Sequence, residues 1–268
     1  MSSNISRMPH SPEQPARKAS REQPLDRAFA LLAALSGAAR PTSITELAAL
    51  CAMPVPTAHR LAGQLEERRL VKRALGSRKL LVGPALVQLG MAAAQAAVQS
   101  DRVHGVLVAL AAKLGEPCQI GVRVDNEVVY VDTVRAARSA GLHFEQGRHA
   151  PIHSSSIGKL FLAEMPDEQL DLWLKNTELP RLTPTTIVSA RKMKATIKDV
   201  RRNGWAASNQ EFAPGVVGCA VPIRLPEGSL IAGLGISVPS ARASLGQVKA
   251  HVPLLQRAAR EIGKAALA

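Results

Sequence analysis

Cysteine is scarce in this chain of 268 residues, which contains only three. Cys51, Cys118 and Cys219 lie far apart, and no C-x-x-C spacing occurs. Disulfide frameworks use an even set of cysteines, and structural zinc sites use closely spaced ones, so neither is predicted. We therefore interpret the cysteines as buried thiols.

Long apolar runs are also missing. No stretch of about 18 uncharged apolar residues occurs, which is the length that a transmembrane helix needs. The opening segment, MSSNISRMPHSPEQPARKASREQ, lacks the apolar core of a secretory signal. A cytoplasmic protein is therefore expected.

Catalytic motifs are absent from the sequence as well. It shows no nucleophile paired with a base, no paired carboxylates and no metal-ligand cluster. Gly233 and Gly235 form an isolated pair without the rest of a dinucleotide fingerprint. His143, His149 and His153 lie within eleven residues, but two of them are expected on a loop, which disfavours a metal site. We expect no enzyme activity, no cofactor and no metal.

What the chain does have is ample apolar content and an uneven positive charge. Hydrophobic residues make up 46%, enough for buried cores, and 268 residues suit two domains with a connector. Residues 1–80 hold 13 Lys and Arg against 6 Asp and Glu, whereas residues 81–268 hold 21 against 15. Because Lys and Arg displace counterions from phosphates, the first third is predicted to bind a polyanion. Charge alone does not choose DNA over RNA or a membrane surface.

The N-terminal third has the pattern of a helix-turn-helix. Residues 1–21 are predicted to be a disordered basic tail because they have almost no apolar content. Helical spacing predicts helices at about 24–36, from the capping box formed by Ser43 and Glu46, and from Pro54 to about Arg68. Strand-like runs at 70–73 and 79–82 predict a hairpin wing. We interpret residues 22–84 as a winged helix-turn-helix DNA-binding domain and residues 85–100 as a linker helix.

The third helix offers side chains that read bases. Its apolar face is predicted to be Ala58, Leu61, Ala62 and Leu65, which leaves the outward set Thr57, His59, Arg60 and Gln64. Arg can bind guanine, Gln adenine and the Thr methyl group thymine. The wing adds the basic set Lys72, Arg73, Arg78 and Lys79, suited to phosphates or the minor groove. The alternative is an ordinary solvated polar face.

Beyond Ser100 the chain alternates between helical and strand-like patterns. Helices are expected at 101–114, 155–164, 167–176, 189–203 and about 245–266. Strands are expected at 118–124, 127–134, near 141–146, 204–210, 217–223 and 230–238. Residues 101–268 are therefore predicted to form an α+β domain with a mainly antiparallel sheet.

Four segments in order make the chain resemble the IclR family of bacterial regulators. They are SITELAALCAMPVPTAHRLAGQLEERRLVKR, GRHAPIHSSSIGKLFLA, TPTTI and GWAASNQEFAPGVVGCAVPI. The resemblance runs from about Leu25 to the C-terminus. It implies a winged helix-turn-helix, a linker helix and a GAF-like effector-binding domain, acting as a homodimer or a dimer of dimers on palindromic promoter DNA.

The chain departs from the family pattern at four positions. Ala52 and Arg69 stand where the family usually has glycine, so each is expected to carry left-handed backbone strain of about 1 kcal/mol or more. Val55 and Pro56 replace a frequent Lys-Ser pair, which removes a phosphate-binding charge and a hydroxyl group. DNA contacts at the start of the third helix are expected to differ.

The resemblance also implies an effector pocket against the sheet, with an anionic group held at the start of the helix after the P-I-H segment. Matching positions give the predicted effector set Ser155, Ser156, Ile157, Gly158, Ser208, Gly218, Cys219, Gly235 and Ser237. Free amide groups at a helix start suit a carboxylate, so a carboxylic acid is expected. Because two polar positions of the family are glycine here, we expect a larger or more apolar acid, aromatic or longer-chain.

These observations predict a DNA-binding transcription regulator controlled by a small carboxylic acid. The partners expected are duplex promoter DNA, the acid and further copies of the chain. A ligand-binding or oligomerisation protein with weakened DNA binding is the alternative that Val55 and Pro56 keep open. An enzyme is the third class weighed, and the missing motifs disfavour it.

Overall fold

The structure, a computed structural model, describes residues 23–38, 40–136 and 145–266. It divides into two compact units, Met1–Leu89 and Gly90–Ala268, and the division falls inside helix α4 (Pro84–Val98), the predicted linker helix. The predicted tail at 1–21 lies outside the described residues. Within the described ranges, no helix is long and apolar enough to cross a membrane.

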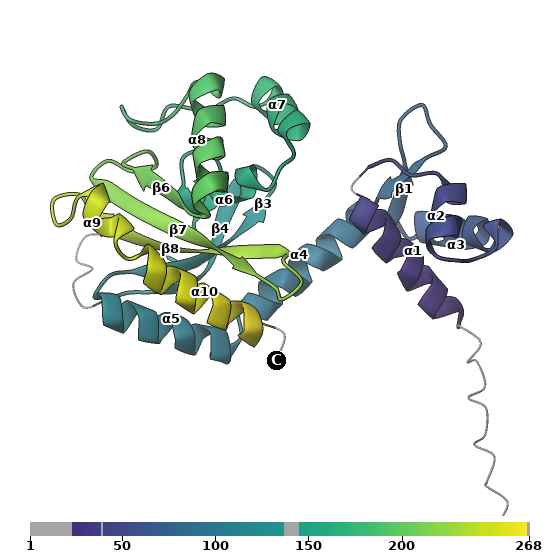
Figure 1. Cartoon of the computed structure of the whole chain (residues 1–268), viewed down its shortest axis with the longest axis horizontal. Helices are drawn as coiled ribbons and strands as arrows, with labels where there is room; N and C mark the ends of the chain where they lie inside the picture. The colour runs from purple at the N-terminus through teal and green to yellow at the C-terminus, as the bar shows by residue number, and fades with distance from the viewer. Residues whose placement is uncertain (1–22, 39, 137–144, 267–268) are drawn as a thin grey trace, which may run out of the picture. The chain divides into compact units, whose positions relative to one another are not determined.

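The first unit is a helix-turn-helix followed by a two-stranded antiparallel hairpin, as predicted (Figure 1). Its elements before α4 are α1 (Pro24–Ala38), α2 (Ile44–Leu50), α3 (Val55–Glu67), β1 (Val71–Arg73) and β2 (Leu80–Val82). The apolar face predicted for α3 is buried against α1 and α2 side chains such as Leu31 and Leu47. This packing fixes which face of α3 is left open.

The capping box at the start of α2 forms only in half. The Ser43 hydroxyl accepts the backbone N–H of Glu46 at 3.2 Å, as the motif predicts. The Glu46 carboxylate, however, binds the Arg40 guanidinium. The cap therefore still fixes the start of α2, while its second partner ties the helix to the preceding loop.

The two positions expected to be strained have the left-handed backbone that was predicted. Ala52 has a φ of 48° after α2, and Arg69 has a φ of 57° after α3. The side chain of each residue opposes this conformation, which glycine adopts freely. Both turns of the first unit therefore carry local strain.

The second unit is an antiparallel six-stranded sheet between two layers of helices, which confirms the predicted α+β class (Figure 1). Its strand order is β5-β4-β3-β8-β7-β6. The elements are α5 (Asp101–Leu114), β3 (Cys118–Val124), β4 (Glu127–Val134), β5 (His149–Pro151), α6 (Ser156–Ala163), α7 (Asp167–Asn176), α8 (Ala190–Asn203), β6 (Ala206–Asn209), β7 (Val216–Arg224), β8 (Leu230–Pro239), α9 (Leu245–Lys249) and α10 (Val252–Ala265). One layer holds α5, α9 and α10, and the other holds α6, α7 and α8.

Two predictions for this unit need correction. The single final helix is two, α9 and α10, because Pro253 lies at the start of α10 and lacks the N–H that a continuous helix would use. The strand expected near 141–146 lies mostly outside the described residues. The edge strand that pairs with β4 is instead β5, in a segment expected to be loop.

Helix α6 lies unusually close to the sheet because glycines face it. A Cβ atom added to Gly233 would come within 2.7 Å of the Ile157 side chain, and one added to Gly235 within 3.3 Å. A Cβ on Gly158 would come within 2.0 Å of the Ile152 carbonyl oxygen. Gly158 leaves no room for a Cβ against the Ile152 backbone, and Gly233 and Gly235 let the Ile157 side chain pack directly on the strands.

The strain at Ala52 gives a test of the fold. We predict that Ala52→Gly stabilises the first unit by about 0.5–1 kcal/mol, because glycine has no side-chain clash at positive φ. Ala49→Gly, the same change in the exposed interior of α2, should destabilise it by about 1 kcal/mol. Hydrogen exchange of α2 and α3 amides measures both, and equal effects of the two substitutions would contradict the assignment of strain.

Candidate DNA-binding surface and effector pocket

The open face of α3 carries Arg60 at its centre. With 100° between successive residues, the side opposite the buried face is formed by Pro56, Arg60, Gly63 and Glu67. Arg60 and His59 are exposed, whereas Thr57 is half-buried. Gly63 was not predicted to lie on this face, because the spacing of apolar side chains gives no information about a residue that has no side chain. A glycine here leaves the helix backbone accessible from outside, with nothing within 4 Å of an added Cβ.

Gln64 lies at the edge of this face rather than at its centre. It is exposed, but it lines an apolar groove of about 450 Å³ between α1, α3 and the start of α4. Leu25 and Phe29 of α1 and Leu89 of α4 border the same groove and are more than 60% exposed. Among the four side chains predicted to contact bases, Arg60 and His59 are thus exposed to solvent without bordering this groove.

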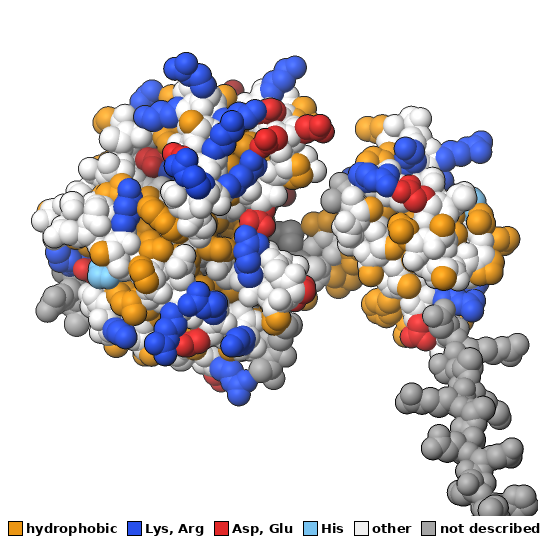
Figure 2. Space-filling model, viewed as in Figure 1, with side chains coloured by type: hydrophobic (Ala, Val, Ile, Leu, Met, Phe, Trp, Pro, Cys, Tyr) orange, Lys and Arg blue, Asp and Glu red, His pale blue; other side chains and the backbone are white. Residues whose placement is uncertain are grey.

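The predicted cations of the wing differ in whether they form an ion pair. Arg73 binds the Glu66 carboxylate of α3 at 3.2 Å and donates to the Arg78 carbonyl group at 3.4 Å. Lys72, Arg78 and Lys79 are exposed, and no ion pair of theirs is found within the described ranges. Figure 2 shows blue side chains around this hairpin. The wing therefore offers free cations, while Arg73 is partly neutralised by α3.

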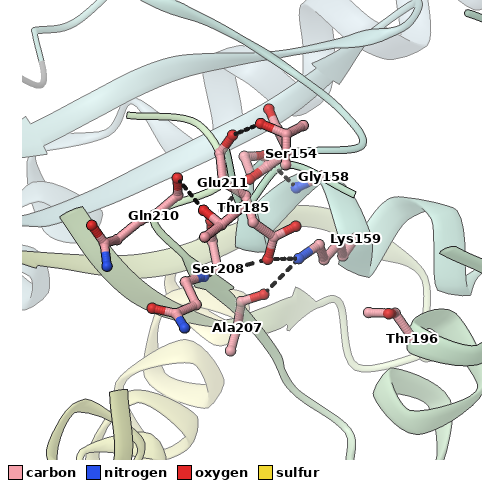
Figure 3. A network of polar contacts seen from close by, with 12 residues as sticks. Ser154, Gly158, Lys159, Thr185, Thr196, Ala207, Ser208, Gln210 and Glu211 are labelled. Atoms are coloured by element: carbon pink, nitrogen blue, oxygen red, sulfur yellow. Dashed lines mark hydrogen bonds and ion pairs between the residues drawn. The ribbon is translucent and has the colours of Figure 1, made fainter. Parts of the chain in front are cut away.

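A buried ion pair connects two elements of the second unit (Figure 3). The ammonium group of Lys159 on α6 is 2.5 Å from the Glu211 carboxylate and donates to the Ala207 carbonyl oxygen at 2.9 Å. The Lys159 side chain is 1% exposed. Burial lowers the pKa of Lys159, and the Glu211 carboxylate opposes that shift. The pair ties α6 to the segment after β6.

The T-P-T-T-I segment holds the same loop from the other side. The Thr183 and Thr185 hydroxyl groups donate to the Gln210 carbonyl oxygen at 2.7 and 2.9 Å, and the Thr186 hydroxyl donates to the Glu211 carbonyl oxygen at 2.7 Å. Gln210 itself has a φ of 57°. Hydroxyl groups thus satisfy the carbonyls of a sharply turned loop, and residues 210–211 are fixed from both sides.

A cavity of about 30 Å³ lies beside this loop. Five members of the predicted effector set line it: Ser155, Ser156, Ser208, Gly218 and Ser237. The rest of its lining is Gln119, Tyr130, Phe212, Ala213 and Val216. Segments far apart in the sequence, from β3 to β8, therefore meet at the start of α6.

Four members of the predicted set lie outside the pocket lining. Cys219 points to the opposite face of the sheet, where its thiol lies 3.5 Å from the Val248 carbonyl oxygen and burial raises its pKa to about 12. Ile157 packs over Gly235 and fills the space that the glycine leaves. Gly158 contributes its N–H to the Ser155 cap at 2.9 Å. The expectation that these glycines enlarge the pocket is wrong for Gly235, because Ile157 takes the room.

Three residues that line the cavity were not predicted from the sequence: Gln119, Tyr130 and Phe212. Gln119 had a signal, since it is a polar residue in the otherwise apolar start of β3 and shares a face with Gly121. Tyr130 is buried, and burial raises its pKa to about 12. Phe212 stacks under the Arg148 guanidinium, 5.0 Å from the ring centroid. Its place in the pocket depends on the loop conformation, which no periodicity encodes.

The described histidines of the predicted loop have partners of their own. His149 Nδ1 is 2.6 Å from the Glu127 carboxylate, and the N–H at Nε2 of buried His153 donates to the Pro180 carbonyl oxygen at 3.1 Å. His143 lies outside the described residues. Within the described ranges, no group of three potential ligands forms a metal site.

Breaking the buried pair should destabilise the second unit strongly. We predict that Lys159→Met costs about 3–5 kcal/mol of unfolding free energy, because the Glu211 carboxylate would stay buried without its cation. The double variant Lys159→Met with Glu211→Gln should cost less than the sum of the single changes. Denaturant unfolding followed by tryptophan fluorescence measures this, since both tryptophans, Trp173 and Trp205, belong to this unit. Additive effects would contradict the coupling.

His153 should make the second unit acid-sensitive. Burial lowers the pKa of His153, so the folded chain keeps its imidazole neutral where the unfolded chain takes up a proton. The contribution of His153 to the free energy of unfolding is fully present above the pKa of the unfolded chain, about 6.5, and is lost as the pH falls below that value. His153→Gln keeps a donor toward Pro180 and should flatten unfolding free energy between pH 7.5 and 5. An unchanged slope would rule out His153 as its source.

Comparison with known proteins identifies the family. Residues 93–264 match the model described as bacterial transcriptional regulator IclR C-terminal, and residues 24–74 match the IclR helix-turn-helix domain. The protein named "Probable transcriptional regulator SauR" of Cupriavidus necator is 31% identical over 89% of this chain and 94% of its own length. The transcriptional repressor IclR of Escherichia coli is 26% identical over 90% of this chain and 88% of its own.

Solved structures agree with this assignment. The Thermotoga maritima IclR structure superposes with a TM-score of 0.58 at 27% identity, covering 90% of this chain and 97% of its own. The inducer-binding domain of PobR from Acinetobacter, a double mutant in complex with 3-hydroxybenzoic acid, gives 0.56 at 28% identity, covering 60% and 94%. These relatives are regulators, not enzymes. The chain belongs to the IclR family of DNA-binding transcription regulators.

Proposed function

We propose that this regulator binds promoter duplexes through α3 and the wing, and that a small carboxylic acid in the pocket at the start of α6 controls this binding. The observation that carries the DNA-binding half is the open face of α3, with Arg60 at its centre and free cations on the wing beside it. Arg60 suits a guanine in the major groove, and Lys72, Arg78 and Lys79 suit phosphates.

The acid-binding half rests on the start of α6. The Ser155 hydroxyl oxygen accepts a hydrogen bond from the backbone N–H of Gly158. The backbone N–H groups of Ser156 and Ile157 have no hydrogen bond within the described ranges. Amides at a helix start, together with the helix dipole, favour an anion. The Ser155 and Ser156 side chains line the cavity at the same point. A carboxylate group is therefore the natural occupant.

Small and aromatic carboxylic acids are both candidates for this cavity. The cavity of about 30 Å³ has room for little more than a water molecule, so any carboxylic acid requires the wall at Phe212 and Ala213 to move, and an aromatic or longer-chain acid requires a larger movement. The PobR domain was solved with 3-hydroxybenzoic acid, which supports testing aromatic acids. Both sizes belong in any screen.

We further propose that the regulator works as a homo-oligomer on a palindromic operator. Leu25, Phe29 and Leu89 border the apolar groove of the first unit and are exposed within one chain. A second copy would bury these side chains and present α3 twice, as a two-fold operator requires. Effector binding would then act by favouring one arrangement of the pair, which only differential affinity can drive. We also propose a cytoplasmic location, which the proposed action on promoter DNA supports.

The alternative is a ligand-binding protein with weakened DNA binding. Val55 and Pro56 at the start of α3 provide neither a cation nor a hydroxyl group, which supports it. Arg60 and the wing cations lie further along and do not depend on those two positions.

Arg60 provides the test of the proposed readout. In the full chain, Arg60→Ala should weaken binding to a duplex selected from a random library by about 1–3 kcal/mol, roughly 5- to 150-fold, and relax its sequence preference. Lys79→Ala should weaken all duplexes alike and lower the salt slope by about one. Gel shifts at fixed salt measure both.

Arg257→Ala changes an exposed cation of the second unit and serves as the matched control, since it should leave DNA affinity unchanged. Failure of the unaltered protein to bind any duplex in dilute buffer would favour the alternative function. Binding that Arg60→Ala leaves intact would instead move the readout to other residues.

A further inference from the structure

One buried polar atom in the effector pocket has no partner. Gln119 is 3% exposed, and its side-chain N–H donates to the Ser237 hydroxyl oxygen at 2.6 Å. The other end of the amide, Oε1, is buried without a hydrogen bond in the described part of the chain. Gln119 and Ser237 both line the cavity. The pocket therefore contains an unsatisfied acceptor.

The sheet register explains how this amide comes to lie in the pocket. In the pairing of β3 with β8, Gln119 lies opposite Gly235, and Ser237 is the diagonal neighbour. Because Gly235 has no side chain, the Gln119 side chain can extend along the sheet and reach Ser237. The cross-strand geometry thus commits the amide N–H to Ser237 and leaves the oxygen for another donor.

An acceptor in this state favours a ligand that supplies a donor. A buried carbonyl oxygen without a hydrogen bond costs about 1–3 kcal/mol, and a bound hydroxyl group would remove that cost. A keto or methyl group at the same place would leave the oxygen unpaired. The pocket is therefore able to distinguish acids by one functional group.

We propose that the effector is a carboxylic acid that also carries a hydroxyl group, and that this hydroxyl donates a hydrogen bond to Oε1 of Gln119. The inference rests on the proposed carboxylate site, which binds the other end of the molecule at the amides of Ser156 and Ile157. Two recognition points on different elements, β3 and α6, fix both the orientation and the chemical class of the ligand. Gln119 is a specificity-determining residue of this pocket.

The experiment compares acids that differ only in the group facing Gln119. Isothermal titration of the full-length protein uses lactate, isobutyrate and pyruvate as a small series, and 3-hydroxybenzoate and 3-methylbenzoate as an aromatic pair. In at least one series, the hydroxy acid should bind about tenfold more tightly than its methyl analogue, and lactate should also exceed pyruvate if the small series binds. This comparison needs only the unaltered protein.

Substitution of the amide then locates the preference. Gln119→Met should bring the hydroxy acid and its methyl analogue to within about twofold of each other, because the acceptor is gone. Gln169→Met, at an exposed glutamine of α7, should keep the full preference. Tryptophan fluorescence confirms that each variant is folded before titration.

The outcomes separate this inference from the proposed function. Acids that bind with equal affinity with and without the hydroxyl group overturn the inference and leave the acid effector standing. Preference for pyruvate over lactate overturns it as well, because the amide would then present its N–H to the ligand. If no acid of either size binds, the acid effector and this inference both fail. A preference that survives Gln119→Met refutes the role of Gln119.

Discussion

A buried ammonium group is the constraint around which the second unit is arranged. Lys159 lies in the layer between α6 and the sheet, where a charge is tolerated only with hydrogen-bonded charge pairing. Glu211 and the Ala207 carbonyl oxygen supply it, so the loop after β6 has to pass directly beside α6. The threonine segment then satisfies the carbonyls of that turned loop. Helix, loop and threonine segment form one polar unit (Figure 3), and Ser208, next to it on β6, lines the cavity.

Local periodicity was sufficient to predict most of the fold. The apolar positions of α3 and the alternation along β3 and β4 are repeated signals, and the helices and strands formed where those signals placed them. The division between α9 and α10 was missed because the apolar spacing continues across it, and only Pro253 marks the break. The strain at Ala52 and Arg69 was predicted from residue type alone, since a non-glycine residue at a left-handed turn is a local fact.

The pocket was predictable only in part, for a physical reason. Ser155 and Ser156 begin a helix, and Ser208 and Ser237 lie on neighbouring parts of the sheet, so motif positions were enough to find them. Cys219 was misplaced because residues 218 and 219 of one strand necessarily point to opposite faces. Gln119 enters through cross-strand register, and Phe212 through a loop held by side chains of three other segments. Such contacts depend on tertiary pairing, which a single sequence does not display.

The packing of Ile157 against Gly233 and Gly235 limits how the cavity can enlarge. The first turn of α6 already touches the strands through Gly233 and Gly235, so that side of the cavity cannot yield to a bulky guest. The facing wall is formed by Phe212 and Ala213, which follow Glu211 in the β6–β7 connection. Enlarging the cavity therefore requires this connection to shift against the hydrogen bonds that hold it, such as the one from the Ser240 N–H to the Gly215 carbonyl oxygen at 2.7 Å. A ligand larger than the present cavity would therefore be coupled to the backbone of the β6–β7 connection and not to α6.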